Sequence, residues 1–107
     1  MITGKQFNEI YYNEKFIKLT NHTCIHNKLK FKEGLNEDLV PFNPSRECKK
    51  GGLYFCNIDD FTDWIEYSDK KMYYMWNVKI PDDAKVVVME NKIKCDKFIL
   101  SNKRRIC

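Results

Sequence analysis

The segment at residues 41–56 reads PFNPSRECKKGGLYFC and constrains the path of the backbone more than any other part of the chain. Its two prolines exclude a continuous helix or a central strand, because proline has a fixed φ and no backbone N–H. The double glycine that follows permits a sharp turn, and the apolar run at 53–56 is typical of a strand. We therefore expect a loop over residues 34–50 that leads into a buried strand.

Alternating apolar residues predict further strands on both sides of this segment. Over residues 16–31 the apolar side chains fall on odd positions and the polar ones on even positions, the period of strands with one buried face, and Asn21 and Asn27 are expected to mark turns or bulges within this segment. Residues 72–80 show the same alternation, with Met72, Tyr74, Trp76, Val78 and Ile80 on one face. We expect a central strand at 86–89, where the apolar run is continuous, and a last short strand at 97–100.

Two short helices are expected. The clearest covers residues 59–67, where Asp59 or Asp60 can cap the first turn and apolar residues recur at helical spacing. A second begins near residue 5 with Thr3 as its cap, and it places Phe7, Ile10 and Tyr11 on one face. Together these elements predict an α+β fold. We expect a single small domain over residues 1–107, mostly antiparallel sheet with one or two short helices, and a basic tail at 101–107.

Composition bounds the class of protein. The net charge is +4 and lysine carries most of the excess, which is less basic than a dedicated nucleic-acid binder. Five irregularly spaced cysteines do not form a disulfide framework, and neither a signal peptide nor a membrane-length apolar run is seen. We therefore expect a protein of a reducing, intracellular compartment with no membrane association.

A metal site is the first chemical interpretation that the sequence raises. On one strand His22, Cys24 and His26 would project from the same face, with Cys48 or Cys56 as a further ligand. However, the strand rise separates the two histidine backbones by roughly 13 Å, too far for both imidazoles to bind one zinc ion comfortably. With no CxxC pair in support, we expect separate side chains, no metal and no cofactor.

Cys48 and Cys56 flank the double glycine and raise two further interpretations. A disulfide between them does not suit a reducing compartment. A catalytic thiol needs a base and an electropositive surrounding. We therefore expect both cysteines to be small, buried and inert.

Seven short motifs together carry a resemblance to a family. They are KLTN at 18–21, HN at 26–27, GLN at 34–36, PFNP at 41–44, GGLYF at 51–55, IPDDA at 80–84 and DKFIL at 96–100. In this order they resemble an uncharacterised family of giant double-stranded DNA viruses, in which the module stands alone or precedes ankyrin repeats. The resemblance spans residues 16–103 and implies a viral protein that acts inside the infected cell or is packaged in the virion. It implies no activity for any named residue.

The segment KGGLYF at 50–55 also resembles the strand of ADP-ribosyltransferases that places a tyrosine beside nicotinamide. The resemblance implies a catalytic role for Tyr54, with His22 or His26 on a ribose hydroxyl and Glu90 stabilising developing positive charge. The chain is about half the usual length for that fold, and it lacks both the glycine beside the early histidine and the helix that carries a second tyrosine.

Basic residues near the C-terminus favour a nucleic-acid contact or a nuclear localisation signal. The candidates are Lys97, Lys103, Arg104 and Arg105. Tyr73 is the aromatic residue expected to be exposed for stacking on bases, because alternation assigns Tyr74 and Trp76 to the core.

The sequence favours a non-enzymatic intracellular interaction module that contacts a host or viral protein through the loop at 34–50. The alternative is a nucleic-acid (DNA) binding protein that uses its lysine-rich surface and basic tail. A second alternative is an ADP-ribosyltransferase-like fold, active or degenerate. The expected location is the cytoplasm, viral factory or nucleus of the infected host, or the virion.

Overall fold

The computed structural model of the chain describes residues 1–26, 28–46, 51–64 and 72–106. Within these residues eight strands form one antiparallel sheet in the order β1-β8-β9-β6-β2-β7-β10-β5, and β3 and β4 form a separate hairpin. The strands are β1 Ile2–Thr3, β2 Phe16–Thr20, β3 Ile25–His26, β4 Leu29–Lys30, β5 Gly34–Glu37, β6 Leu53–Asn57, β7 Tyr74–Lys79, β8 Lys85–Val88, β9 Ile93–Cys95 and β10 Lys97–Arg105. With the helix α1 (Gly4–Ile10) and the 3-10 helix η1 (Ile58–Asp63), they confirm the expected compact α+β domain.

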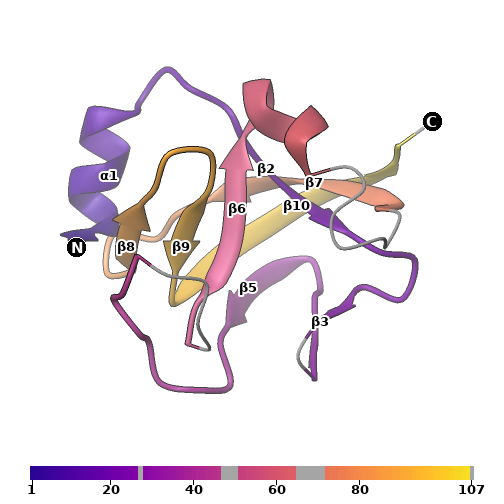
Figure 1. The fold of residues 1–107 in the computed structure, drawn as a ribbon, viewed down its shortest axis with the longest axis horizontal. Coiled ribbons are helices and arrows are strands. Elements are labelled where there is room, and N and C mark those ends of the chain that lie inside the picture. The colour runs from indigo at the N-terminus through magenta and orange to yellow at the C-terminus, as the bar shows by residue number, and fades with distance from the viewer. Residues whose placement is uncertain (27, 47–50, 65–71, 107) are drawn as a thin grey trace.

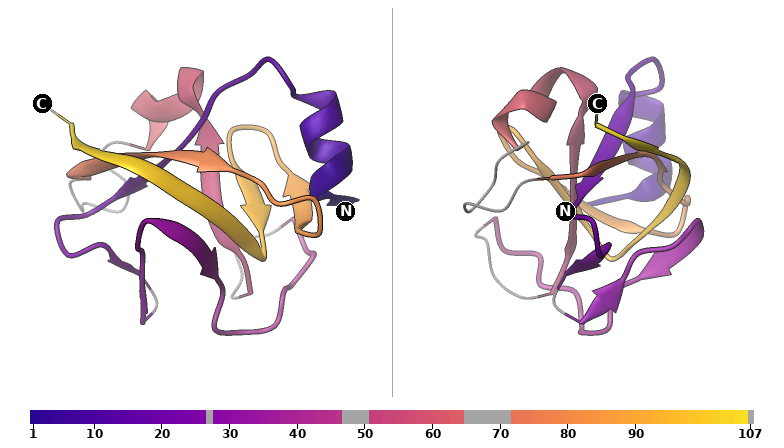
Figure 2. Two further views of the ribbon diagram at one scale, coloured as in Figure 1. Left: turned by 180° about the vertical axis from the view of Figure 1, so that it is seen from behind. Right: turned by 90° about the vertical axis from the view of Figure 1, so that its right-hand side faces the viewer.

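The sheet is strongly twisted, and its two faces bury different clusters. In Figure 1, β7 and β10 cross behind the upright strand β6, and seen from behind in Figure 2 they run side by side, as their pairing requires. One face holds the main core: Phe7, Cys24, Phe31, Leu53, Phe55, Trp76, Ile80, Ala84, Val86, Ile93, Cys95, Phe98 and Leu100. The other face holds a smaller cluster of Ile17, Leu19 and Cys56, which Phe61, Trp64 and Met75 partly cover.

Strand β2 has a polar side that faces the main core. Ile17 and Leu19 point into the smaller cluster, so the alternate residues Lys18 and Thr20 point toward the main core. Thr20 is buried there and accepts a hydrogen bond from the indole Nε1 of Trp76 at 3.0 Å. The even positions of this strand, which the sequence pattern assigns to solvent, are therefore partly interior.

The described residues of the proline–glycine segment at 41–56 behave largely as expected. Gly51 adopts φ +98, and its carbonyl accepts a hydrogen bond from the Asn43 N–H at 2.7 Å. The chain then enters β6, where Leu53 and Phe55 are buried in the main core. One correction applies: residues 34–37 inside the expected loop form the strand β5, which pairs with β10.

The extended segment expected over residues 16–31 is interrupted beside Asn21, where a turn or bulge was expected; Asn27, the second such position, lies outside the described residues. The chain forms β2, turns at residues 22 and 23, and resumes as the β3–β4 hairpin. Cys24 lies in this break with φ +57, and Ile25 is 47% exposed although the alternation assigned it to the core. The turn interrupts the alternation at Ile25, although Leu29 and Phe31 pack in the main core as the pattern predicts.

The two helices begin near their expected positions but differ in detail. Thr3 caps α1 in a capping box with Gln6, and Phe7 is buried as expected, while Ile10 is exposed. The expected helix at 59–67 is a 3-10 helix over Ile58–Asp63 whose cap is Asn57, not an aspartate. Residues 65–71 lie outside the described residues.

Two further strand predictions need correction. Met72 packs on the smaller cluster and not with the alternate residues of β7 on the main core. The strand expected to be central, β8, lies one place from the end of the sheet, although the short strand β1 covers its outer edge.

No helix in the described ranges is long and apolar enough to cross a membrane.

The largest correction concerns the C-terminus. Strand β10 does not end at residue 100; it continues through the expected basic tail to Arg105. Its pairing with β7 is irregular, because Ser101 lies opposite Asn77 and Arg104 lies opposite Met75. Two residues of β10 therefore oppose the single residue Trp76, which is the arrangement of a β-bulge.

Candidate nucleic-acid interface

The bulge in β10 brings Lys103 onto the aromatic side chains of β7. The bulge residue Asn102 has φ +53, a left-handed conformation that asparagine adopts more readily than most residues. The Nζ atom of Lys103 lies 4.7 Å from the ring centroid of Tyr74 and 5.5 Å from that of Trp76. These are cation–π distances.

Arg105 makes a similar contact two residues further along. The central carbon of its guanidinium lies 4.7 Å from the ring centroid of Tyr73. The Tyr73 and Tyr74 rings contact each other edge to face, with centroids 4.8 Å apart, and the His22 ring lies edge-on to Tyr73 at 6.5 Å. We name this surface the cationic–aromatic face and define it by Tyr73, Tyr74, Trp76, Lys103 and Arg105.

The two cations of the face carry unneutralised charge. Within the described residues neither Lys103 nor Arg105 forms an ion pair, and both side chains are exposed. Tyr73 and Tyr74 are half-buried, so part of each ring is accessible to a ligand. Trp76, in contrast, is 3% exposed and forms the floor beneath Lys103.

The four basic residues that the sequence offers as candidates do not lie on one surface. Lys103 and Arg105 lie on the cationic–aromatic face. Arg104 points to the other side of β10, where one guanidinium nitrogen contacts the Met75 sulfur at 3.2 Å. Lys97 lies at the opposite end of the strand and pairs with Asp83 at 3.0 Å, which raises the pKa of Lys97 and lowers that of Asp83.

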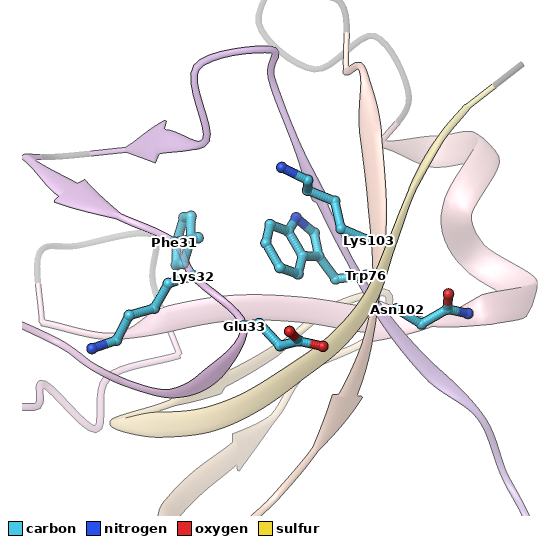
Figure 3. A pocket seen from close by; sticks show the side chains of 6 residues that line it. All are labelled: Phe31, Lys32, Glu33, Trp76, Asn102 and Lys103. Carbon is cyan, nitrogen blue, oxygen red and sulfur yellow. The ribbon is translucent and has the colours of Figure 1, made fainter.

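A pocket of about 480 Å³ opens beside the face. It is lined by Phe31, Lys32, Glu33, Trp76, Asn102 and Lys103. Figure 3 shows Phe31 and Trp76 on opposite sides of this space, with Lys103 next to the indole ring and Asn102 directed away from it. Aromatic walls and a lysine-rich rim suit a planar or anionic ligand.

A buried asparagine fixes the outer wall of this pocket. The side-chain amide of Asn36 donates to the carbonyls of Lys32 and Gly34, at 2.8 and 3.0 Å, and its oxygen accepts from the Lys32 N–H at 3.0 Å. These bonds satisfy the backbone of residues 32–34 where the sheet ladder does not. The Asn36 side chain therefore bridges the two sides of the turn that carries Glu33.

The three catalytic candidates do not lie together. His26 is on β3 and Glu90 is in the β8–β9 turn, and Figure 1 shows these two segments on opposite sides of the molecule. Tyr54 lies on β6 with the Nζ atom of Lys92 4.9 Å from its ring centroid. Glu90 instead lines a second, smaller pocket of about 210 Å³ whose lining does not include Tyr54.

The metal candidates are dispersed as well. Cys24 is buried in the main core, with its sulfur 3.7 Å from the Thr20 hydroxyl, while His22 contacts Tyr73 and His26 is exposed on β3. They do not share one strand face, because the chain turns between them. Among the described residues no group of three His, Cys, Asp or Glu side chains is placed to hold a metal ion.

Cys56 is not an activated thiol. Burial is the main cause that raises its pKa to about 11, and the carboxylate of Asp60 adds to the effect. Burial likewise raises the pKa of Cys95 well above its usual value. Both thiols are therefore protonated and unreactive near neutral pH. Cys48, the other thiol considered with Cys56, lies outside the described residues.

No protein-family model matches the chain, and neither does any curated protein or solved structure. The function therefore has to be argued from the site alone. Sequence reasoning found Lys103, Arg105 and Tyr73 but missed the bulge that brings the first of these onto Trp76. The available signal was Asn102, because an asparagine inside a strand pattern favours a left-handed residue.

Proposed function

We propose that this chain is a non-enzymatic binding module and that it binds single-stranded nucleic acid on the cationic–aromatic face. One observation carries the proposal: Lys103 and Arg105 have no ion pair within the described residues, and each lies directly over an aromatic ring from the start of β7. Proteins that bind single strands combine these two elements, cations for the phosphates and ring faces for the bases.

The geometry favours single strands over duplexes. Tyr73 and Tyr74 are neighbours in the chain with their rings in contact, so unstacked bases could pack against the accessible parts of both. Lys103 and Arg105 stand next to these rings and can move to bind phosphates without breaking an ion pair. Bases in a duplex are stacked on one another and present no free ring faces.

The charge of the chain is consistent with moderate affinity. The net charge of +4 is small, and the face contributes two cations, with Lys32 at the rim of the adjacent pocket. Each phosphate contact releases counterions, so the binding should weaken as salt rises. We therefore expect the nucleic acid to bind to a short site and not along a long basic groove.

A titration of labelled oligonucleotides tests the proposal. The wild-type protein is added to a single strand and to a blunt duplex of the same length at low salt, and fluorescence anisotropy is recorded. We expect the single strand to bind at least severalfold more tightly, with an affinity that falls as salt is added. Equal affinity for the two, or no binding to the single strand, contradicts the proposal.

A second candidate function is a protein contact through the segment at 34–40. Leu35, Leu39 and Val40 are 45%, 65% and 42% exposed, and β5 is the last strand in the sheet order. Exposed apolar side chains beside an edge strand favour the binding of an extended segment of another protein. This candidate retains the host or viral protein partner that the sequence favours.

A capture experiment separates this candidate from nucleic-acid binding. The wild-type protein and a Leu39→Ser, Val40→Ser variant are used as baits in nuclease-treated lysate of infected cells. A partner that binds the wild type and is lost with the variant supports the protein contact. A partner retained equally by both baits contradicts it.

We also propose that the protein is viral and acts inside the infected host cell. The motifs shared with the giant-virus family support the origin. The compartment is supported by Cys24, Cys56 and Cys95, which are buried free thiols and thus suited to reducing surroundings. Detection of the protein by mass spectrometry in fractions of infected cells and in purified virions tests both statements.

A further inference from the structure

Lys18 is a lysine on the interior side of the sheet. It lies in β2 directly opposite Trp76 of β7, and its Nζ atom is 5.0 Å from the ring centroid of Phe31. The residue is half-buried, and its side chain points toward the main core. A lysine on a surface strand would instead extend into solvent.

No carboxylate among the described residues is paired with Lys18. In the described part of the chain it forms no ion pair, and the titratable groups that act on it are the thiols of Cys95 and Cys56. Both thiols are protonated near neutral pH because burial raises their pKa values. Desolvation by burial therefore dominates and lowers the pKa of Lys18 from 10.5 to about 8.

A lysine in this state is a nucleophile. An ordinary lysine is almost entirely protonated near neutral pH, whereas a desolvated one keeps an appreciable fraction of neutral amine with a free electron pair. Burial of an uncompensated lysine also costs folding free energy, so its presence in the interior calls for an explanation.

The pocket beside the cationic–aromatic face shares two of its lining residues with the surroundings of Lys18. Phe31 and Trp76 both line the pocket. The Phe31 ring centroid is 5.0 Å from the Lys18 Nζ atom, and Trp76 lies directly opposite Lys18 on the neighbouring strand. The lining includes two cations, Lys32 and Lys103, against the single carboxylate of Glu33. A small anion is therefore the ligand that this pocket favours.

We propose that Lys18 is a covalent binding site for small anionic carbonyl compounds, aldehyde acids and oxo acids, that enter the pocket between Phe31 and Trp76. The neutral amine of Lys18 attacks the carbonyl carbon and forms a C–N bond. The resulting carbinolamine loses its oxygen as water, and the product is an imine. The carboxylate of the compound lies toward Lys103. This site does not depend on nucleic-acid binding.

Reductive trapping with glyoxylate tests the proposal. The folded wild-type protein is incubated near neutral pH with glyoxylate and cyanoborohydride, which reduces the imine to a stable secondary amine, and each lysine is followed by peptide mass spectrometry. Lys79, exposed on β7, is the internal reference. We expect Lys18 to be modified roughly tenfold faster than Lys79, because its neutral fraction is larger. A rate for Lys18 equal to or below that of Lys79 overturns the proposal.

A second arm tests the role of charge. The Lys103→Ala variant, checked for an unchanged circular dichroism spectrum, is treated with glyoxylate and in parallel with acetaldehyde, which has no carboxylate. We expect modification of Lys18 by glyoxylate to slow severalfold and modification by acetaldehyde to stay unchanged. Equal rates with glyoxylate in wild type and variant, or equal slowing with both probes, contradict the anionic class of ligand.

Discussion

The Nζ atom of Lys103 lies 5.5 Å from the centre of the Trp76 indole ring, and the bulge in β10 is the cause of this contact. In a regular ladder that continued from the Ser101–Asn77 pair, residue 103 would lie opposite Met75, whose side chain belongs to the opposite face. The extra residue moves Arg104 to that place and turns Lys103 toward Trp76. The extra residue thus decides that Lys103, and not Arg104, lies on the side of Trp76.

The bulge residue itself provides the first prediction. Asn102→Val places a β-branched side chain at φ +53, where it is strained, so we expect a loss of about 1–2 kcal/mol in the free energy of unfolding. We also expect weaker single-strand binding, because Lys103 is displaced. Asn102→Gly, which accepts this φ, is the matched control. Urea denaturation and oligonucleotide titration check both variants, and equal behaviour of the two would show that the backbone conformation is not required.

The hydrogen bond between Trp76 and Thr20 provides the second. Thr20→Val removes the hydroxyl that accepts from the indole N–H while it keeps the shape of the side chain. We expect a loss of about 1–3 kcal/mol in the free energy of unfolding, since a buried donor is left without its partner. Thr20→Ser retains the hydroxyl and should lose less than Thr20→Val. Denaturation with urea measures both, and a stable Thr20→Val protein would contradict the account.

Lys18 provides a prediction that depends on pH. Its pKa is lowered in the folded chain, from 10.5 to about 8, so the unfolded chain binds this proton more tightly. The contribution of Lys18 to stability therefore rises between pH 8 and 10.5 and is most unfavourable below pH 8. Lys18→Met should stabilise the protein by about 2 kcal/mol near neutral pH.

The same difference should shrink as the solution is made alkaline. At about pH 10 the wild-type lysine is neutral when folded, so the advantage of Lys18→Met should largely disappear. Both proteins retain Cys56 and Cys95, so most of the effect of thiol titration cancels in the comparison, and what remains comes from the charge of Lys18, which lowers the pKa of both thiols. Urea denaturation at the two pH values is the measurement. A stabilisation that does not change with pH would show that Lys18 is not desolvated.

The double glycine provides the fourth prediction. A Cβ atom on Gly52 would collide with the side chain of Lys94, which is fully buried and donates to the carbonyls of Asn43 and Ser45 at 2.7 and 2.9 Å. We expect Gly52→Ala to cost about 1–3 kcal/mol, because the lysine cannot move without losing these bonds. Gly34→Ala adds strain without a collision, since φ is +94 and nothing lies within 4 Å. We therefore expect Gly34→Ala to lower the free energy of unfolding by less than Gly52→Ala when both are measured by urea denaturation. Equal losses would rule out the collision at Gly52.

Local patterns predicted those parts of the fold that local chemistry controls. Thr3 caps α1, and the glycine turn leads the chain into β6 with Phe55 buried, because capping and turn preferences act over a few residues. The alternation in β7 placed Trp76 in the core correctly. The overall α+β class followed from these elements taken together.

Features set by distant residues could not be predicted in this way. Lys18 is half-buried because β2 has buried clusters on both faces, which a single alternating pattern does not reveal. The last strand extends to Arg105 because β7 offers it a partner, whereas the sequence alone suggests a solvated basic tail. Of the candidate site, the cations Lys103 and Arg105 could be named in advance, but their separation from Arg104 depends on the bulge.

The salt dependence of single-strand binding tests the central claim most directly. Affinities are measured at several salt concentrations for the wild type, for Lys103→Ala with Arg105→Ala, and for Lys79→Ala, which removes an exposed lysine at the other end of β7. We expect the double variant to bind more weakly and to lose about 0.7 in the log–log salt slope for each phosphate contact removed, while Lys79→Ala matches the wild type. Equal slopes in the double variant and the wild type would contradict the assignment of the cationic–aromatic face.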